Sequence, residues 1–172
     1  MPNLIIIAGP NGAGKTTFAR EYLSGEKHVE FVNADEIAHD IENISDVLAA
    51  RIMLTRVDDL IANKADFAIE TTLASLTYAQ KIPAWREQGY TVSLVFIRLG
   101  SAAESIARVR RRIAAGGHGI PEKTLVRRFS KSRDYFETIY KPIVDTWYLW
   151  ESREGAFSLI DSGGRHEPEA EN

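Results

Sequence analysis

The stretch IIIAGPNGAGKTTFA, residues 5–19, constrains the fold more than any other part of the chain. A short apolar run leads into a glycine-rich turn, and the turn ends in Lys15 and Thr16 directly before residues that favour a helix. The pattern Gly-x-x-x-x-Gly-Lys-Thr between a strand and a helix is typical of a loop whose backbone N–H groups hold nucleotide phosphates. We expect the nucleotide-binding residues to be Gly9, Pro10, Asn11, Gly12, Ala13, Gly14, Lys15, Thr16 and Thr17.

Two side chains of this loop have distinct expected roles. Lys15 supplies a cation to the β- and γ-phosphates, and the Thr16 hydroxyl is the expected metal ligand, for Mg²⁺. No Asn-Lys-x-Asp stretch of the kind that reads guanine is present. The predicted cofactors are therefore ATP and Mg²⁺.

Apolar runs alternate with helical patterns along the chain, which predicts an α/β fold with a parallel sheet and right-handed crossovers. This is the P-loop NTPase, nucleotide-kinase-like architecture, with helices flanking the sheet. The predicted strands cover 3–8, 29–33, 66–72, 90–99 and 156–161. The predicted helices cover 15–23, 46–63, a segment ending near 88–89, 102–115, and a segment from Pro121 through 143. On the helix over 46–63 we expect Ser45 as N-cap and Ile44, Val47, Leu48 and Ile52 on one face.

Length and composition fit a single domain of an ordinary globular protein. The chain has 172 residues, 44% of them hydrophobic and 26% charged, and a formal charge of −3. We expect one P-loop kinase domain over 1–161 and a polar, disordered tail over 162–172. The absence of cysteine excludes disulfides and thiolate chemistry. The apolar run over 4–8 is too short to span a membrane, so we expect a cytoplasmic protein without a membrane partner.

Polar residues at the ends of two predicted strands are candidates for binding a second substrate. Asp35 follows the strand over 29–33, at the carboxyl edge where ligands of α/β sheets bind, and we predict that it is a general base. The alternative is that Asp35 is the N-cap of a short helix. Glu70 ends the run FAIE and is predicted to hold either a Mg²⁺-bound water or a substrate hydroxyl. Thr71 and Thr72 beside it are predicted either to bind substrate or to cap locally.

A basic segment, SIARVRRRIAAGGHGIPEKTLVRRF, follows the fourth predicted strand. Ile106, Val109 and Ile113 have the spacing of a core stripe, which places Arg108 and Arg112, together with Arg111, on the opposite side of the helix. Like charges at i and i+4 repel, and a bound polyphosphate would reverse that effect. A solvated basic face or a nucleic-acid track are the alternatives.

Glycine-rich residues 116–119 separate this basic helix from the next helix, which also carries arginines. A hinge between arginine-bearing helices is what a closing lid requires, because closure excludes water and brings cations to the transferring phosphate. His118 within the hinge is predicted to contact substrate or to be a surface side chain. Arg128 is a predicted substrate contact, although spacing does not distinguish it from Arg127.

Four segments in this order, GPNGAGKTTFA, FVNADEIA, AIETTLAS and RVRRRIAAGGHGIPEKTLVRRF, resemble the zeta toxin family, in its short branch, over roughly residues 3–161. The resemblance implies a P-loop kinase that phosphorylates a hydroxyl of a UDP-activated amino sugar, and in the toxins an antitoxin protein as partner. Lys15 and Thr16 match the nucleotide and Mg²⁺ positions of the family, and Asp35 matches its base. Glu70 with its two threonines resembles the sugar-nucleotide-binding strand end, and Arg108 and Arg112 resemble lid arginines.

The leading hypothesis is an ATP-dependent phosphotransferase whose acceptor is a small molecule, with a UDP-N-acetylhexosamine favoured. Asp35 is the base, and Lys15, Arg108 and Arg112 stabilise charge. One alternative is a polynucleotide or nucleotide 5′-hydroxyl kinase that uses the basic segment to bind a phosphate backbone. Phe129, Tyr135 and Phe136 near that segment are predicted to be core residues rather than base-stacking platforms. The other alternative is a nucleotide-dependent binding switch controlled by a partner protein.

Overall fold

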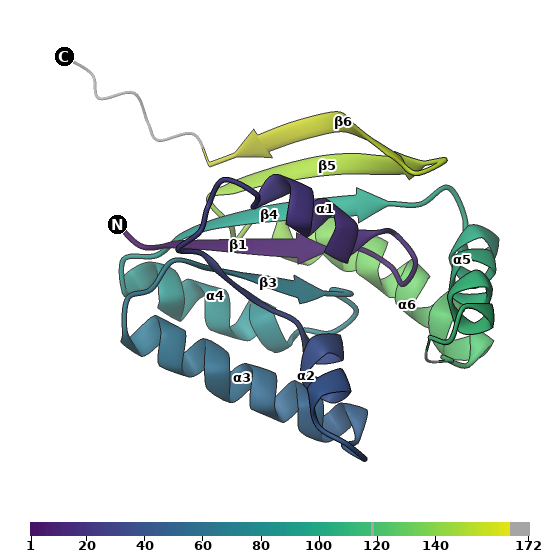
Figure 1. The fold of residues 1–172 in the computed structure, drawn as a ribbon. Coiled ribbons are helices and arrows are strands. Elements are labelled where there is room, and N and C mark those ends of the chain that lie inside the picture. Colours follow the sequence, from purple (N-terminus) through teal and green to yellow (C-terminus); the bar gives the residue numbers. More distant parts are fainter. Residues whose placement is uncertain (118, 166–172) are drawn as a thin grey trace.

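A six-stranded sheet in the order β2-β3-β1-β4-β5-β6 forms the centre of the molecule (Figure 1). The structure is a computed structural model and describes residues 1–117 and 119–165. The strands are β1 (Asn3–Ala8), β2 (Glu30–Val32), β3 (Phe67–Thr71), β4 (Thr91–Arg98), β5 (Thr146–Arg153) and β6 (Ala156–Gly164). The first five strands pair in parallel, and β6 pairs antiparallel with β5. The predicted α/β fold is confirmed.

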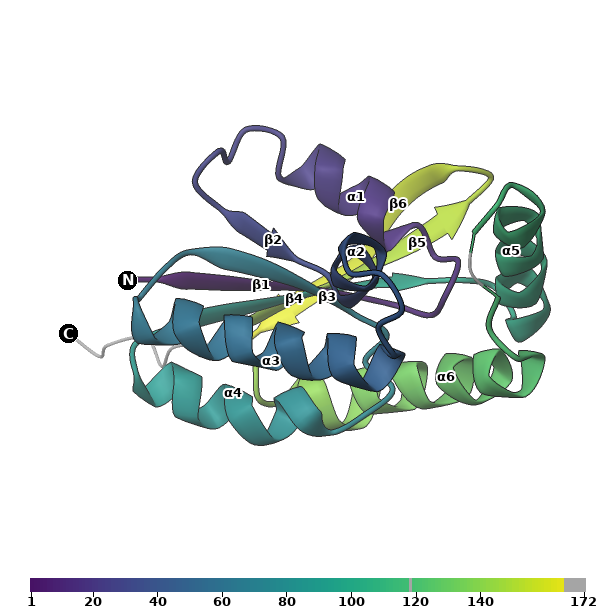
Figure 2. The same cartoon turned by 60° about the horizontal axis from the view of Figure 1, so that its bottom comes forward.

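Helices cover both faces of this sheet. They are α1 (Lys15–Tyr22), α2 (Ala34–Asp40), α3 (Asp46–Ala62), α4 (Thr77–Glu87), α5 (Ala102–Ala114) and α6 (Glu122–Tyr135), and a π-helical turn, η1 (Phe136–Tyr140), continues α6. Figure 2 shows α1 on one face and α3, α4 and α6 on the other. The short helix α2 and the helix α5 lie toward the carboxyl ends of the strands (Figure 1).

Alternate side chains of the central strands contribute to two hydrophobic clusters, one on each face of the sheet. In β1, Leu4 and Ile6 face the cluster under α3, α4 and η1, whereas Ile7 faces the smaller cluster under α1. This is the period-2 alternation of a strand buried on both faces. The predicted core positions of Phe129, Tyr135 and Phe136 are confirmed, because each packs on one of the two clusters.

The strand β5 is an element that the sequence pattern did not predict. Its side chains are nearly all half-buried, so the alternation that marks a strand is absent. The residues that follow β5 add an antiparallel strand, β6, at the edge of the predicted parallel sheet. Glu154 and Gly155 both have positive φ angles, 51° and 77°, and join the paired residues Arg153 and Ala156. A two-residue turn of this kind fits only an antiparallel hairpin.

The helix α3 buries a different face from the predicted one. Ser45 caps it as expected, since its Oγ accepts a hydrogen bond from the Leu48 backbone N–H at 3.2 Å. Val47 and Leu48, however, are exposed, and the buried residues are Ala49, Met53, Val57, Leu60 and Ile61. The apolar residues of the first turn therefore face solvent rather than the core.

The predicted end of the domain at residue 161 falls inside β6, which continues to Gly164. Residues 166–172, most of the predicted tail, lie outside the described residues. No helix in the part of the chain that the structure describes has both the length and the apolar character needed to cross a bilayer.

Asp145 joins three elements at the end of the sheet opposite the phosphate loop. One carboxylate oxygen accepts from Nη2 of Arg86 on α4 at 2.5 Å, and the other accepts from the Val92 backbone N–H at 2.8 Å. Burial by itself raises the pKa of Asp145, but the hydrogen bonds from Arg86 and Val92 outweigh it, so that the pKa lies below its usual value of 3.8. The ionised carboxylate therefore stabilises the fold.

We expect Asp145→Asn to lower the free energy of unfolding at pH 7 and to have progressively less effect as the pH falls. A carboxyl whose pKa is lower in the folded state contributes stability above its unfolded pKa and loses it as the pH falls through the folded value. Urea unfolding of both proteins between pH 7 and pH 3 measures this difference. Asp134→Asn, at an exposed position on α6, is the control. A difference that stays constant over this range would contradict the assignment.

Candidate functional site

The turn between β1 and α1 has the conformation that phosphate binding requires. Gly9, Gly12 and Gly14 have φ angles of 154°, 82° and 86°, which residues other than glycine rarely adopt. A Cβ atom at Gly9 would lie 2.4 Å from the carbonyl oxygen of Ile97 on β4. Gly14 is the N-cap of α1, so the N-terminus of this helix points at the loop. The loop is thus a cradle of backbone N–H groups that fits a polyphosphate.

We expect Gly9→Ala to abolish tight ATP binding. The substitution combines a strained φ angle, at a cost of about 1–3 kcal/mol, with a clash against backbone that cannot move without disturbing β4. Gly25→Ala is the matched control, because a Cβ atom there has no neighbour within 4 Å. Calorimetric titration with ATP·Mg²⁺ and thermal unfolding separate lost binding from lost folding. Wild-type ATP affinity in Gly9→Ala would show that the loop tolerates a side chain.

Lys15 is the buried cation of this loop, with 7% of its surface exposed. Its ammonium donates hydrogen bonds to the carbonyl oxygens of Gly9 at 2.8 Å and Pro10 at 3.2 Å. Burial lowers the pKa of Lys15, and the carboxylates of Glu70 and Asp35 act in the opposite direction. Lys15 thus lies close to both carboxylates that the sequence singles out.

Thr16 and Glu70 are in direct contact. The Thr16 hydroxyl donates to Oε2 of Glu70 at 2.9 Å, and Nδ2 of Asn33 donates to the same oxygen at 2.7 Å. Burial raises the pKa of Glu70, while Lys15 and the Thr16 hydrogen bond lower it. Because β1 and β3 are neighbouring parallel strands, their carboxyl ends bring the phosphate loop and Glu70 together.

Asp35 lies in the first turn of α2, and the alternative that it caps this helix is wrong. The N-cap is Asn33, whose Oδ1 accepts from the Asp35 backbone N–H at 2.8 Å. The Asp35 side chain is exposed at the carboxyl edge of the sheet, within electrostatic range of Lys15 and Glu70. Its carboxylate therefore faces solvent beside the phosphate loop.

The two threonines after Glu70 differ. The Thr71 hydroxyl accepts a hydrogen bond from the Leu73 backbone N–H at 3.0 Å, and the Thr71 carbonyl accepts from the Gly9 N–H at 3.3 Å. Thr71 thus stabilises the end of β3 and the start of the phosphate loop. Thr72 is half-buried and makes no side-chain hydrogen bond within the described residues.

The helix α5 is fixed against the phosphate loop by two side chains. The Ser105 hydroxyl, which is fully buried, donates to the Asn11 carbonyl oxygen at 2.6 Å. Nη1 of Arg108 donates to the Gly12 carbonyl oxygen at 3.1 Å and to the Ser152 hydroxyl at 2.8 Å, and its Nη2 donates to Glu104 at 2.8 Å. Arg108 therefore contacts the nucleotide loop rather than pointing away from the protein.

The arginines of α5 and α6 separate into two groups that spacing did not distinguish. Arg112 and Arg128 lie near enough to Lys15 for their charges to lower its pKa, and Nη1 of Arg128 donates to Oδ1 of Asn11 at 3.3 Å. Arg111 and Arg127 are exposed and, among the described residues, form no hydrogen bond with the phosphate loop. In the expected core stripe, Val109 is buried and Ile106 is half-buried, whereas Ile113 is 41% exposed.

The glycines after α5 end the helix. Gly116 has a φ angle of 96°, and its N–H donates to the Ile113 carbonyl oxygen at 2.9 Å. The Gly117 N–H donates to the Arg112 carbonyl oxygen at 2.8 Å. These two bonds form a Schellman motif. A hinge at this point stays a prediction, and His118 lies outside the described residues.

Two functional candidates, Asn33 and Ser105, were missed by reasoning from the sequence. Each is polar and at most 5% exposed, and each bonds to a predicted site residue. Asn33 directly precedes the helix that carries Asp35, which is a recognisable N-cap signal. No sequence signal links Ser105 to Asn11, which is far from it in the chain.

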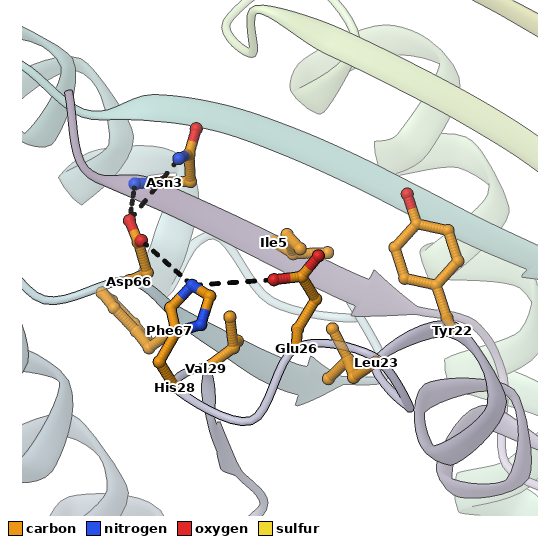
Figure 3. A pocket seen from close by; sticks show the side chains of 9 residues that line it. All are labelled: Asn3, Ile5, Tyr22, Leu23, Glu26, His28, Val29, Asp66 and Phe67. Atoms are coloured by element: carbon orange, nitrogen blue, oxygen red, sulfur yellow. Dashed lines mark hydrogen bonds and ion pairs between the residues drawn. The ribbon is translucent and has the colours of Figure 1, made fainter.

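A cavity of about 330 Å³ lies at the opposite, amino-terminal edge of the sheet (Figure 3). In it, carboxylate oxygens of Glu26 and Asp66 lie 3.6 Å and 3.7 Å from Nε2 of His28. The cavity opens beside the starts of β1 and β3, whereas the phosphate loop follows the end of β1. It is therefore separate from the candidate site.

The donor set of the candidate site fits Mg²⁺. Within residues 1–117 and 119–165, no three His, Asp or Glu side chains cluster as a protein-only metal site would require. Mg²⁺ at phosphate-transfer sites instead takes one or two protein oxygens and completes its shell with phosphates and water. The oxygen atoms of Thr16 and Glu70, beside the phosphate cradle, meet that requirement.

Comparison with known proteins gives the family. The model of the zeta toxin family matches residues 1–163, nearly the whole chain. The chain belongs to the zeta toxin family. An uncharacterized protein from Haemophilus influenzae is 27% identical over 129 residues, which cover 73% of this chain and 91% of that protein.

Two solved structures share the fold of this zeta toxin family member at low sequence identity. A chain from the PezAT chromosomal toxin–antitoxin system of Streptococcus pneumoniae is 17% identical, with a TM-score of 0.70, covering 99% of this chain and 75% of that chain. A chain from the AvrRxo1-ORF1:AvrRxo1-ORF2 structure with ATP is also 17% identical, with a TM-score of 0.69. The match covers 94% of this chain and 58% of that chain. The fold is that of P-loop kinases, which bind nucleotides.

Proposed function

We propose that this protein is an ATP-dependent phosphotransferase that phosphorylates a hydroxyl of a small molecule, most favourably a UDP-N-acetylhexosamine. One observation carries the proposal. The exposed carboxylate of Asp35 acts electrostatically on both Lys15 and Glu70 at the carboxyl edge of the sheet, so a candidate base and the phosphate cradle share one edge of the sheet. A nucleotide switch needs no such base, whereas a kinase must accept the proton of its acceptor hydroxyl.

In the proposed reaction Asp35 accepts the proton of the acceptor hydroxyl as its oxygen bonds to the γ-phosphorus of ATP. The bond between the γ-phosphorus and the β,γ-bridging oxygen breaks, and ADP leaves with the electron pair. Lys15 moves from the carbonyl oxygens of Gly9 and Pro10 to the β- and γ-phosphates. The backbone N–H groups of the loop hold the same phosphates during the transfer.

Negative charge that develops on the transferring group is balanced by cations. We assign this role to Arg112 and Arg128, whose charges already act on Lys15. Arg108 would contribute through the position of the phosphate loop, because its guanidinium donates to Gly12 and Ser152. Mg²⁺, when bound, would neutralise part of the negative charge on the phosphates. Thr16 and Glu70 are the residues that would hold it.

The acceptor and the partner are proposed from the family. The strand end that carries Glu70, Thr71 and Thr72 resembles the sugar-nucleotide-binding strand end of the family. Because the Thr71 hydroxyl is bonded to the Leu73 N–H, we assign the substrate contacts to Glu70 and Thr72. One solved neighbour comes from a toxin–antitoxin system, and this supports an antitoxin protein as the partner of this chain. We propose that the protein acts in the cytoplasm, where ATP and nucleotide sugars are present.

The test is ³¹P NMR of the purified protein with ATP·Mg²⁺ and a mixed pool of UDP-sugars, with Lys15→Ala as control. We expect a new phosphomonoester resonance that the control does not produce. If only ADP and free phosphate form, the sugar nucleotide is the wrong acceptor. If a 5′-hydroxyl oligonucleotide is phosphorylated instead, with an affinity that falls steeply with salt, the protein is a polynucleotide kinase that uses its arginines on a phosphate backbone.

A further inference from the structure

Asn33 has an unusual position for a helix-capping residue. It is 5% exposed, and both ends of its side-chain amide are hydrogen bonded. Oδ1 accepts from the Asp35 backbone N–H at 2.8 Å, and Nδ2 donates to Oε2 of Glu70 at 2.7 Å. Capping alone requires the acceptor but not the donor. The second bond therefore calls for a separate explanation.

The two bonds connect three elements that carry the candidate site. Asn33 follows β2, its acceptor bond fixes the start of α2 beside Asp35, and its donor bond reaches the end of β3 at Glu70. Oε2 of Glu70 also accepts from the Thr16 hydroxyl on α1. Of the residues favoured at N-caps, asparagine alone has both an acceptor and an N–H donor on a side chain of this length. Aspartate and serine could replace only the cap.

We propose that Asn33 is a positioning residue that fixes Glu70 toward the Mg²⁺ of bound ATP while it fixes the start of the helix that carries Asp35. The inference rests on the proposed function in taking Thr16 and Glu70 as the metal-holding groups. Because Asn33 and Thr16 both bond to Oε2, the carboxylate cannot rotate freely, and Oε1 accepts no hydrogen bond from the described residues. Oε1 is the oxygen that would bind the metal or one of its waters.

The distinction between a cap and a positioning residue is testable with substitutions that keep only the cap. Asn33→Ser retains an N-cap hydroxyl but is too short to reach Glu70, and Asn33→Asp retains the cap but has no N–H to donate. Ser45→Ala removes the cap of α3, which is not part of the candidate site, and serves as a matched control for lost capping. ATP binding is measured by calorimetry at increasing Mg²⁺ concentration, without any acceptor.

We expect the Mg²⁺ concentration that gives half-maximal enhancement of ATP binding to rise about tenfold in Asn33→Ser and not in Ser45→Ala. The inference is wrong if Asn33→Ser keeps the wild-type Mg²⁺ dependence. It is equally wrong if ATP binding by the wild-type protein does not depend on Mg²⁺. A wild-type protein that binds ATP·Mg²⁺ but transfers no phosphate would refute the proposed function and leave this inference intact.

A double-mutant cycle shows whether Asn33 acts through Glu70. If it does, Asn33→Ser adds little to the effect of Glu70→Gln on Mg²⁺ dependence, because the contact that it would break is already changed. The same cycle in urea unfolding of the nucleotide-free proteins measures the coupling free energy between Asn33 and Glu70 without any ligand. Additive effects of the two substitutions in both measurements would overturn the inference.

Discussion

We expect Lys15→Ala to fold but to lose the proposed phosphoryl transfer, with turnover lower by about 10³-fold. The ammonium of Lys15 is buried in the phosphate loop and donates to the backbone carbonyl oxygens of Gly9 and Pro10, which places a cation where it can interact with phosphate. Burial lowers the pKa of Lys15, which means that the folded protein disfavours the charged form of this side chain. We therefore expect the protein to fold without it. Turnover is measured from the phosphomonoester that forms, and folding from circular dichroism.

The control for this substitution is Lys27→Ala, at an exposed position in the connection between α1 and β2. It removes the same charge from the protein as a whole and should leave turnover unchanged. If Lys15→Ala and Lys27→Ala lower turnover equally, the effect comes from net charge rather than from the phosphate loop. Wild-type turnover in Lys15→Ala would remove Lys15 from the mechanism.

Asp35→Asn has the second large expected effect. The variant should fold and bind ATP·Mg²⁺ as the wild type does, because Asn33 rather than Asp35 caps α2. Its turnover should fall by about 10²–10⁴-fold, since an amide cannot accept the proton of the acceptor hydroxyl. The measurement is single-turnover transfer from ATP at saturating acceptor, with ATP affinity determined separately by calorimetry.

Asp40→Asn is the matched control, because Asp40 is an exposed aspartate on the same helix. It tests whether turnover responds to any lost negative charge on α2. Transfer at near-normal rate by Asp35→Asn would rule out Asp35 as the base. Loss of ATP binding together with turnover would assign Asp35 to nucleotide binding instead.

The phosphate loop could be predicted from the sequence because its determinants are local. Gly9 and Gly14 are required by their own positive φ angles, and Lys15 follows them at a fixed spacing. The placement of Asp35 and Glu70 at the same edge of the sheet could be predicted for a different reason. The carboxyl ends of parallel strands lie at one edge, so polar residues that end two strands converge even when they are far apart in the chain.

The hairpin of β5 and β6 and the buried face of α3 could not be predicted in the same way. Nearly all side chains of β5 are half-buried, since this strand lies near the edge of the sheet where neither face is fully covered. Val47 and Leu48 on α3 have helical spacing but are exposed. Periodicity shows which residues share a face, but whether that face meets another element depends on the rest of the fold.

The sequence by itself determined the fold class, the phosphate loop, and the two strand ends that carry Asp35 and Glu70. Only the tertiary structure decided which arginines face the loop, that Arg108 bonds to Gly12, and that Asn33 connects the two carboxylate-bearing elements. The reason is physical. Motif and periodicity are short-range properties of the chain, whereas the partner of a polar side chain is chosen by whichever distant group the packing brings within about 3 Å.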